Sequence, residues 1–322
     1  MNSTRIVFSD NTPQRLDHYL VRKYSDFSRT KIQRLIKNHS VKVNDTSVKT
    51  GYQLQMGDVI MIEEFEDQNR LQNIIPEPIP LEIIHEDESI LVINKPPGMV
   101  VHPGTGNLTG TLVNGLIYYY NELSSVNGPL RPGIVHRLDQ ETSGVIITAK
   151  NNKAHRMIAN QFKERLIIKK YMGITWGEWK ESRGSIEASL KRNRKDPTSY
   201  LVDDSGRTAI THFKIIKSFR YMSFVEFLPK TGRTHQIRVH CCYVHHPIVY
   251  DRKYNGGLNR IKGFIPEVQK DLRTVIKRIG RHALHANEIT FIHPDTGNNV
   301  TFEAPIPADM QMVISHLYKH YD

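Results

Sequence analysis

The chain contains the stretch His136-Arg137-Leu138-Asp139-Gln140-Glu141-Thr142-Ser143-Gly144, which lies between apolar residues 134–135 and 145–147. The two apolar segments have the pattern of buried strands. A loop of polar and small residues between two strands is where a rigid scaffold displays reactive groups. Asp139 is therefore the candidate nucleophile or base of a site. The alternative is a structural ion pair between Asp139 and Arg137, and the spacing alone leaves both interpretations open.

A second stretch, Lys230-Thr231-Gly232-Arg233-Thr234-His235-Gln236-Ile237-Arg238-Val239-His240, combines a turn with the start of a helix. We expect Thr234 to cap that helix, because a threonine side chain can accept a hydrogen bond from the first turn. Arg238 lies near the edge of the helix's buried face. A half-buried arginine needs a carboxylate partner, and we expect that partner to be Asp139.

A third stretch, Lys169-Lys170-Tyr171-Met172-Gly173-Ile174, follows a basic pair with a strand-like segment that begins at Tyr171. The pattern fits a tyrosine of the core as well as a tyrosine that contacts a substrate. It leaves both interpretations open.

The composition is that of a basic, globular protein. Its 322 residues include 44 Lys and Arg against 33 Asp and Glu, which gives a formal net charge of +11. Such an excess favours a polyanionic partner over a neutral metabolite. The two cysteines are adjacent, which excludes a disulfide framework and favours the reducing cytoplasm. We expect no membrane segment, because no apolar run approaches the ~20 residues of a spanning helix and the N-terminus has no signal-peptide pattern.

The positive charge is concentrated near the N-terminus, where residues 15–49 hold nine Lys and Arg against three Asp. Residues 28–38 have the apolar spacing of a short helix with one buried stripe. Basic side chains lie along this helix, and we expect them to contact phosphate groups rather than only water. They are Arg29, Lys31, Arg34 and Lys37.

Three regions follow from composition and pattern. Residues 13–64 form a compact helix-plus-hairpin unit, and residues 65–80 have the features of a linker, because acidic residues are followed there by closely spaced prolines. Residues 81–322 mix strand and helix patterns and form the larger domain.

The first region resembles the small RNA-binding domain named after the fourth small-subunit ribosomal protein. The resemblance rests on Arg15-Leu16-Asp17, Ser28-Arg29, Ile36-Lys37, Val41-Lys42-Val43-Asn44 and Gly57-Asp58-Val59-Ile60. The glycine that this family often has after the helix is replaced by Asn38-His39-Ser40. Asn and His tolerate the left-handed conformation better than most residues, so the domain remains compatible with this sequence.

The larger region resembles the RluA/RluD-type pseudouridine synthases, and the resemblance covers nearly the whole chain. It rests on the stretches 136–144 and 232–240, and on Asn94-Lys95-Pro96, Val101-His102-Pro103-Gly104, Leu284-His285-Ala286 and Phe302-Glu303-Ala304-Pro305. The chain departs from the family at Val249-Tyr250-Asp251, where a glycine usually precedes the aspartate. That departure bears on a local loop conformation.

This resemblance implies an α+β fold, with a mixed, mainly antiparallel sheet and flanking helices, preceded by the small α/β RNA-binding domain. It implies that Asp139 is the essential aspartate, that Arg238 pairs with it, and that Tyr171 stacks on the target base. Arg137 corresponds to an arginine that fills the space of a flipped nucleotide. We also expect Arg233 and Leu284, which lie in or beside the matching motifs, to contact the substrate.

The implied reaction is the site-specific isomerisation of uridine to pseudouridine in RNA, with base flipping and an essential aspartate. By analogy we expect large-subunit (23S) ribosomal RNA or the pre-ribosomal subunit as substrate, and a monomeric enzyme in the cytoplasm. Nothing is oxidised and no group is added, so no cofactor is expected. We expect no metal either, because the His and Cys residues between His235 and His246 lack the paired spacing of a structural zinc site.

Two other functions compete with this interpretation. A pure RNA-binding or ribosome-assembly factor would explain the charge but not the three matching motifs. A glycoside hydrolase also attacks a sugar carbon, but generally needs two cooperating carboxylates. Glu141 is close to Asp139 in sequence, although nothing indicates that both face one substrate.

Overall fold

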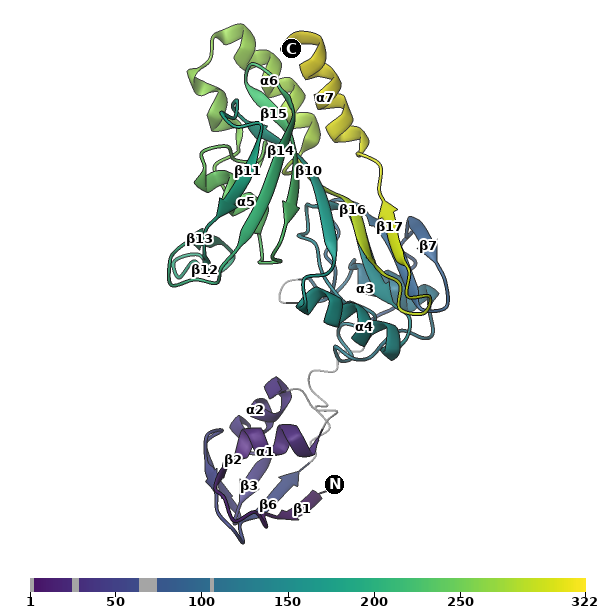
Figure 1. Ribbon diagram of the computed structural model, residues 1–322, viewed down its shortest axis with the longest axis vertical. Helices are drawn as coiled ribbons and strands as arrows, with labels where there is room; N and C mark the ends of the chain where they lie inside the picture. The colour runs from purple at the N-terminus through teal and green to yellow at the C-terminus, as the bar shows by residue number, and fades with distance from the viewer. Residues whose placement is uncertain (1–2, 25–28, 64–73, 105–106) are drawn as a thin grey trace. The chain divides into compact units, whose positions relative to one another are not determined.

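The computed structural model describes residues 3–24, 29–63, 74–104 and 107–322, without the side chains of Ser3, Thr30, Lys31, Arg34 and Glu63. The chain divides into two compact units, Met1–Gln72 and Asn73–Asp322, and each is described by itself (Figure 1). None of the helices in these described residues is long and apolar enough to cross a membrane.

The first unit packs two helices on a small antiparallel sheet. Its strands pair in the order β1-β6-β3-β4, and β2 pairs separately with β5. The elements are β1 (Ser3–Val7), β2 (Gln14–Arg15), α1 (Leu16–Lys23), α2 (Arg29–Lys37), β3 (Val41–Val43), β4 (Thr46–Ser47), β5 (Gln53–Leu54) and β6 (Val59–Glu63). Ile32 and Ile36 of α2 are buried in the core beside Leu16 and Leu20 of α1. The helix expected at residues 28–38 is therefore present over Arg29–Lys37.

The C-terminal end of α2 has a left-handed residue where the small RNA-binding domain family often has a glycine. His39 has a φ of 62°, in the left-handed region. The amide of His39 donates to Ile36 O at 3.2 Å and that of Ser40 to Leu35 O at 3.0 Å. This is the hydrogen-bond pattern of a Schellman motif, whose left-handed residue is usually glycine. The left-handed conformation expected at residues 38–40 is thus adopted by His39.

We predict that His39→Gly stabilises α2 by about 0.5–1 kcal/mol, because glycine has no Cβ that opposes a positive φ. His39→Ala keeps the Cβ and should give no such gain. The measurement is the free energy of opening of the α2 amides, obtained by native-state hydrogen exchange on the full chain. Equal opening energies for the glycine and alanine variants would contradict the prediction.

The second unit is built on one nine-stranded sheet. The strands are ordered β11-β14-β15-β10-β16-β9-β8-β7, and β17 pairs with the distal part of β16. The strands are β7 (Ile83–Glu86), β8 (Ile90–Lys95), β9 (Ser143–Ala149), β10 (Ile168–Trp176), β11 (Arg183–Glu187), β14 (Ile210–Ser218), β15 (Met222–Pro229), β16 (Leu284–Ile292) and β17 (Asn299–Glu303). A separate hairpin is formed by β12 (Leu190–Arg192) and β13 (Tyr200–Val202).

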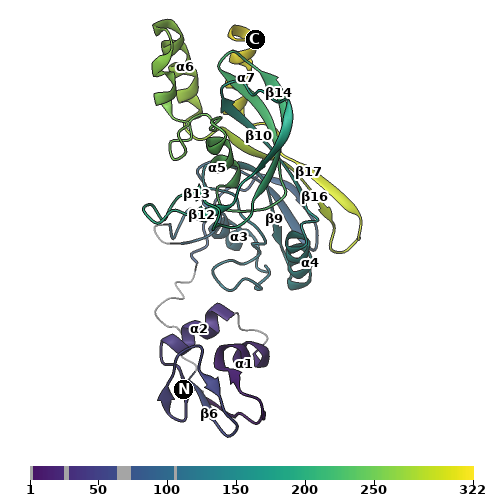
Figure 2. The same cartoon turned by 60° about the vertical axis from the view of Figure 1, so that its left-hand side comes forward.

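Helices cover this sheet on both faces, as Figure 2 shows for the region around β9. They are α3 (Leu112–Tyr119), α4 (Asn152–Lys163), α5 (Gln236–Tyr243), the 3-10 helix η1 (Leu258–Gly263), α6 (Pro266–Ile279) and α7 (Ala308–His320). Along β8, Ile90 and Val92 pack in the cluster that contains α4, whereas Leu91 and Ile93 pack in the cluster that contains α3. Because successive strand residues point to opposite faces, α3 and α4 cover opposite faces of β8.

The fold predicted from the sequence is confirmed. Every strand pair described in the large sheet is antiparallel except β9 with β16, which pair in parallel through His285–Ser143 and Ala286–Gly144. Gly144 has a φ of +113°, and a Cβ built there would lie 2.1 Å from Ala286 O. Only glycine fits this approach, so Gly144 allows the strand that follows the Asp139 loop to enter the sheet.

Residues 74–80 belong structurally to the second unit. The Glu77 amide donates to Asn114 O at 3.0 Å, and Asn114 Nδ2 donates to Ile75 O at 2.8 Å. A Cβ on Gly115 would meet Ile79, so the segment runs close against α3. The rest of the expected linker, residues 65–73, lies outside the described residues.

Candidate active site

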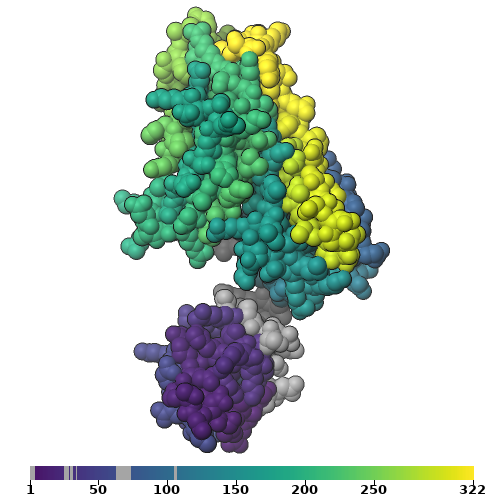
Figure 3. Space-filling model, viewed as in Figure 1, coloured from purple at the N-terminus to yellow at the C-terminus, as the bar shows by residue number. Residues whose placement is uncertain are grey.

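A cleft of about 520 Å³ opens in the second unit, between the end of α4 and the segment that leads into α5 (Figure 3). Its lining is strongly basic. Asp139 is the one carboxylate among the described residues that line it. The cations that line it are Arg137, Lys163, Arg165, Lys169, Lys230, Arg233 and Arg238. Such a cleft favours a polyanion that approaches a single, largely buried carboxylate.

The Asp139 loop is fixed to the sheet by His136. His136 Nε2 accepts a hydrogen bond from the Ile147 amide at 2.9 Å, and its ring packs on Phe162 at a centroid distance of 4.9 Å. Burial, together with the charge of Lys169, lowers the pKa of His136 to about 3. The imidazole is therefore neutral at pH 7 and acts as a hydrogen-bond acceptor that fixes the loop.

Two buried basic side chains hold the carbonyl groups next to Asp139. Lys95 Nζ donates to Gln140 O at 3.0 Å and also to Met99 O and Pro96 O. Arg281 Nη1 donates to Glu141 O at 3.0 Å. Both side chains are almost fully buried, and burial lowers the pKa of Lys95 to about 7. Arg281 is also paired with Asp309, with its Nε 2.8 Å from Asp309 Oδ2. The loop is thus held in one conformation before any substrate binds.

Asp139 and Arg238 are in direct contact. Arg238 Nη1 donates to Asp139 Oδ2 at 2.9 Å, which is the contact expected from the sequence. The Asp139 side chain is 19% exposed and that of Arg238 is 8% exposed. Among the described residues, the ion-pair contacts of Asp139 are with Arg238 and His235, and none is with Arg137. Among the described contacts, Arg137 and Asp139 therefore do not form the structural ion pair that was the alternative interpretation.

Asp251 is a partner of Arg238 that sequence reasoning missed. Arg238 Nε donates to Asp251 Oδ2 at 2.6 Å, and Nη2 donates to Asp251 Oδ1 at 3.0 Å. This two-point contact fixes the guanidinium plane and leaves Nη1 for Asp139. Burial by itself would lower the pKa of Arg238, but Asp251 and Asp139 outweigh it and raise the pKa. Arg238 therefore stays charged.

The loop that carries Asp251 contains the departure from the family pattern. Tyr250 has a φ of 63°, so a tyrosine adopts the left-handed conformation where the family usually has glycine. Asp251 Oδ1 then accepts from the amides of Lys253 and Tyr254 at 3.1 and 3.2 Å. This loop directs the Asp251 carboxylate at Arg238 of α5.

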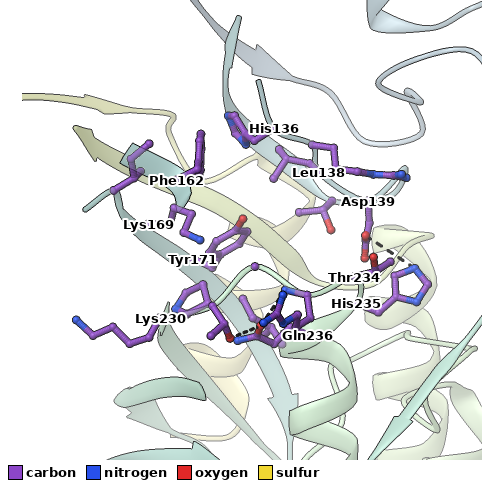
Figure 4. Close-up of a pocket in the computed structure, with 18 of the residues that line it drawn as sticks. His136, Leu138, Asp139, Phe162, Lys169, Tyr171, Lys230, Thr234, His235 and Gln236 are labelled. Carbon is purple, nitrogen blue, oxygen red and sulfur yellow. Dashed lines mark hydrogen bonds and ion pairs between the residues drawn. The ribbon is translucent and has the colours of Figure 1, made fainter. Parts of the chain in front are cut away.

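His235 is a second neighbour of Asp139 that the sequence did not reveal. Its Nε2 lies 3.8 Å from Asp139 Oδ1, and its Nδ1 lies 2.7 Å from Tyr254 Oη (Figure 4). Burial lowers the pKa of His235, which favours the neutral ring. His235, with a φ of 57°, is also the residue that precedes α5. The expectation that Thr234 caps this helix is wrong, because α5 begins two residues later and has no side-chain cap.

Tyr171 lies on β10 beside the site, but β10 begins at Ile168 rather than at Tyr171. A bulge between Lys170 and Tyr171 shifts the register with β16. Figure 4 shows Lys169, Tyr171, Leu138 and Asp139 pointing into one space. Burial, and then the charge of Asp139, raise the pKa of Tyr171, so its hydroxyl stays protonated. Its ring is thus available as a neutral face.

Both units of the chain are similar to known proteins. Residues 89–243 match the RNA pseudouridylate synthase family, and residues 14–60 match the S4 domain. The uncharacterized RNA pseudouridine synthase YlyB of Bacillus subtilis is 40% identical over 321 residues, covering 99% of this chain and 100% of that protein. The chain belongs to the RNA pseudouridine synthase family.

Other similarities agree with this family. The ribosomal large subunit pseudouridine synthase D of Haemophilus ducreyi is 36% identical over 324 residues, covering 100% of this chain and 96% of that protein. The solved structure of human RNA pseudouridylate synthase domain containing 4 has a TM-score of 0.57 at 25% identity, covering 74% of this chain and 93% of that one. The chain is thus an RNA pseudouridine synthase with an N-terminal S4 domain.

The remaining residues expected in the synthase's site lie at the cleft or in the S4 domain. Arg137 is exposed and lines the cleft, as do Arg233 and the buried Leu284. In the S4 domain, Arg29 is exposed at the start of α2, with Nη2 3.3 Å from His18 Nε2 and 3.7 Å from Asp17 Oδ2. Lys37 is exposed at the end of α2. The side chains of Lys31 and Arg34 lie outside the described residues.

One group of potential metal ligands in the described part of the synthase lies away from the cleft lining. It consists of His85, Asp87 and His293. Both histidines place Nε2 against Asp87 Oδ2, at 2.8 and 2.9 Å. His293 Nδ1 accepts from two backbone amides, so its Nε2 carries the proton and donates to Asp87. Hydrogen bonding occupies the atom that a metal ion would need.

Proposed function

We propose that this synthase isomerises uridine in large-subunit ribosomal RNA, through a flipped nucleotide and the Asp139 carboxylate. The observation that carries the proposal is the contact of Asp139 with Arg238, itself held by Asp251, in a cleft where seven cations and no second carboxylate are among the described lining residues. The relatives named ribosomal large subunit pseudouridine synthase D support this choice of substrate. The S4 domain is the type of module that grips structured RNA.

The reaction breaks the bond between the ribose and the uracil nitrogen and joins the ribose to a ring carbon. The proton on that carbon leaves and the released nitrogen gains one, so atoms and electrons balance without a co-reactant. A stacked base hides this bond, and extruding the nucleotide costs a few kcal/mol. We propose that Arg137, which is exposed at the cleft, offsets this cost by filling the vacated space.

Asp139 performs the step at the sugar as an anion. It either attacks the sugar carbon or removes a sugar proton, and both routes use the same oxygen atoms. Arg238 Nη1 binds Oδ2 and orients the group, which leaves Oδ1 toward the cleft and His235. Tyr171 holds the detached uracil against its neutral ring while the base rotates. Leu284 and Arg233 complete the walls around the nucleotide.

A glycoside hydrolase would need a second carboxylate in the cleft. Glu141 does not line it among the described residues, and the Glu141 carbonyl is held by Arg281. A pure binding factor would have no use for a carboxylate that is clamped by a buried arginine. Both alternatives are therefore less well supported than isomerisation.

The test is an assay of the reaction itself. We expect the purified full-length protein, without added cofactor, to release C5 tritium from unmodified large-subunit ribosomal RNA of the source organism. Chemical mapping should then place pseudouridine at specific positions that are also missing from cells lacking the gene. Modification of transfer RNA alone would refute the proposed substrate, and the absence of turnover on any RNA would refute the proposed reaction.

A further inference from the structure

A second groove of about 480 Å³ continues from the catalytic cleft toward the β12–β13 hairpin. The two share Gly232, Arg233 and Thr234, so this short segment forms a wall of both. Because the segment is common, the groove and the cleft lie next to each other. The groove is thus in a position to bind the part of the substrate that adjoins the reacting nucleotide.

The charges of the groove are positive. Its described lining residues include Lys191, Arg192, Arg207 and Arg233, and none with a carboxylate. Lys191 is neutralised, because its Nζ lies 3.3 Å from Asp203 Oδ2. The three arginines have no ion pair among the described residues. Arg192 Nε donates to Pro197 O at 2.5 Å and Arg233 Nε to Thr208 O at 3.3 Å, so both guanidinium groups are oriented by backbone rather than by acids.

The hairpin that forms the far wall is held by its own hydrogen bonds. Asn193 N donates to Ser199 O at 3.0 Å, and Asp196 Oδ1 accepts from the Thr198 amide at 3.0 Å. Lys253 Nζ reaches Thr198 Oγ1 at 2.5 Å and ties the loop to the segment after α5. Arg192 is therefore presented on a preformed wall, which reduces the entropy lost when a ligand binds. The backbone of Arg207 is tied to the same hairpin by two hydrogen bonds with Leu190, both of 2.9 Å.

Tyr200 connects this wall to the catalytic residues. Its amide donates to Tyr254 Oη at 2.9 Å, and its ring meets the His235 ring edge to face at 5.8 Å. Tyr200 also lines the groove, so an aromatic ring lies among the three arginines. Arginines that bind phosphate beside an aromatic ring that stacks a base are the combination found in single-strand RNA sites.

We propose that this groove is a subsite for the nucleotide adjacent to the flipped uridine. Arg192 and Arg207 bind its phosphate, Tyr200 contacts its base, and Arg233 bridges to the phosphate of the reacting nucleotide. The inference rests on the proposed function, because it assigns the strand in the groove to the same RNA. The inference adds a site that binds the RNA backbone next to the target uridine.

The test uses the full-length protein with Arg192→Gln and Arg207→Gln combined. Both side chains are exposed, so the fold should be kept. On unmodified large-subunit ribosomal RNA we expect affinity to fall about tenfold, and the slope of log Kd against log salt to decrease by about one for each phosphate that is no longer bound. The matched control, Arg273→Gln with Lys277→Gln, removes two exposed charges from α6 and should change neither quantity.

A short RNA around a mapped uridine then locates the contact. Removing the neighbouring nucleotide on one side should weaken binding by the wild-type protein, but not by the arginine variant. An unchanged affinity and salt slope in that variant, with active wild-type protein, would overturn the subsite and leave the proposed function intact. If the arginine substitutions lowered the affinity for the trimmed and the full RNA equally, the subsite would also be overturned. Such a result would indicate a non-specific electrostatic attraction rather than a contact with the neighbouring nucleotide. Inactive wild-type protein would instead refute the proposed function.

Discussion

Asp139→Asn should lower the single-turnover rate of isomerisation by at least about a thousandfold, because the amide has the shape of the carboxylate but not its charge or basicity. The amide oxygen can still accept from Arg238, which keeps its two contacts with Asp251. RNA affinity should therefore stay within about twofold, since the phosphate contacts that dominate it are untouched. Tritium release with enzyme in excess and filter binding measure the two quantities.

Glu141→Gln is the matched control for this variant. It neutralises the carboxylate nearest in sequence, which does not line the cleft among the described residues. We expect its rate to be close to that of the wild-type protein. Near-normal turnover by Asp139→Asn, or an equal loss in Glu141→Gln, would refute the role of Asp139.

Asp251→Asn should be the most destabilising of the substitutions considered. The side chains of Asp251 and Arg238 are 1% and 8% exposed, so the variant leaves a buried guanidinium without its main counter-charge. Removal of one partner from such a pair costs about 3–5 kcal/mol. The freed guanidinium should also lose its orientation toward Asp139, so the isomerisation rate should fall as well. Urea unfolding of the second unit and single-turnover kinetics test both effects.

The double variant Asp251→Asn with Arg238→Met separates stability from activity. A methionine removes the buried guanidinium that Asp251→Asn leaves without its main counter-charge, and that unpaired charge is the source of the expected destabilisation. We expect most of the lost stability to return while the rate stays low. If the double variant recovered both the stability and the isomerisation rate, Arg238 would have no role at Asp139. If Asp251→Asn alone kept the full stability, the buried pair of Arg238 with Asp251 would not be important for the fold.

Sequence patterns predict what is local and miss what the fold assembles. The Asp139 loop, the helix after Gly232 and the S4 helix are each encoded within about ten residues, so pattern and motif find them. The pair of Arg238 with Asp139 is predictable because a buried arginine requires a carboxylate. The stronger partner of Arg238, Asp251, is 13 residues away and faces α5 only because Tyr250 accepts a positive φ.

The start of α5 shows the same limit at a single position. Thr234 has the side chain of a helix cap, whereas the structure uses a left-handed His235 without a capping side chain. That backbone conformation brings the imidazole to Tyr254 and Asp139. A local preference is overridden by contacts from a distant loop, which a propensity argument cannot anticipate.

The close approach at Gly144 has a consequence for how substitutions are tolerated in this molecule. The strand after the Asp139 loop and the strand that begins with Leu284 join through only two residue pairs in the described sheet, and at one of them a Cβ would lie 2.1 Å from a carbonyl oxygen. A methyl group added at Gly144 would force β9 and β16 apart. It would also shift the Asp139 loop relative to Leu284, which lines the opposite part of the cleft. The relative position of the Asp139 loop and of Leu284 therefore depends on the absence of a side chain at residue 144.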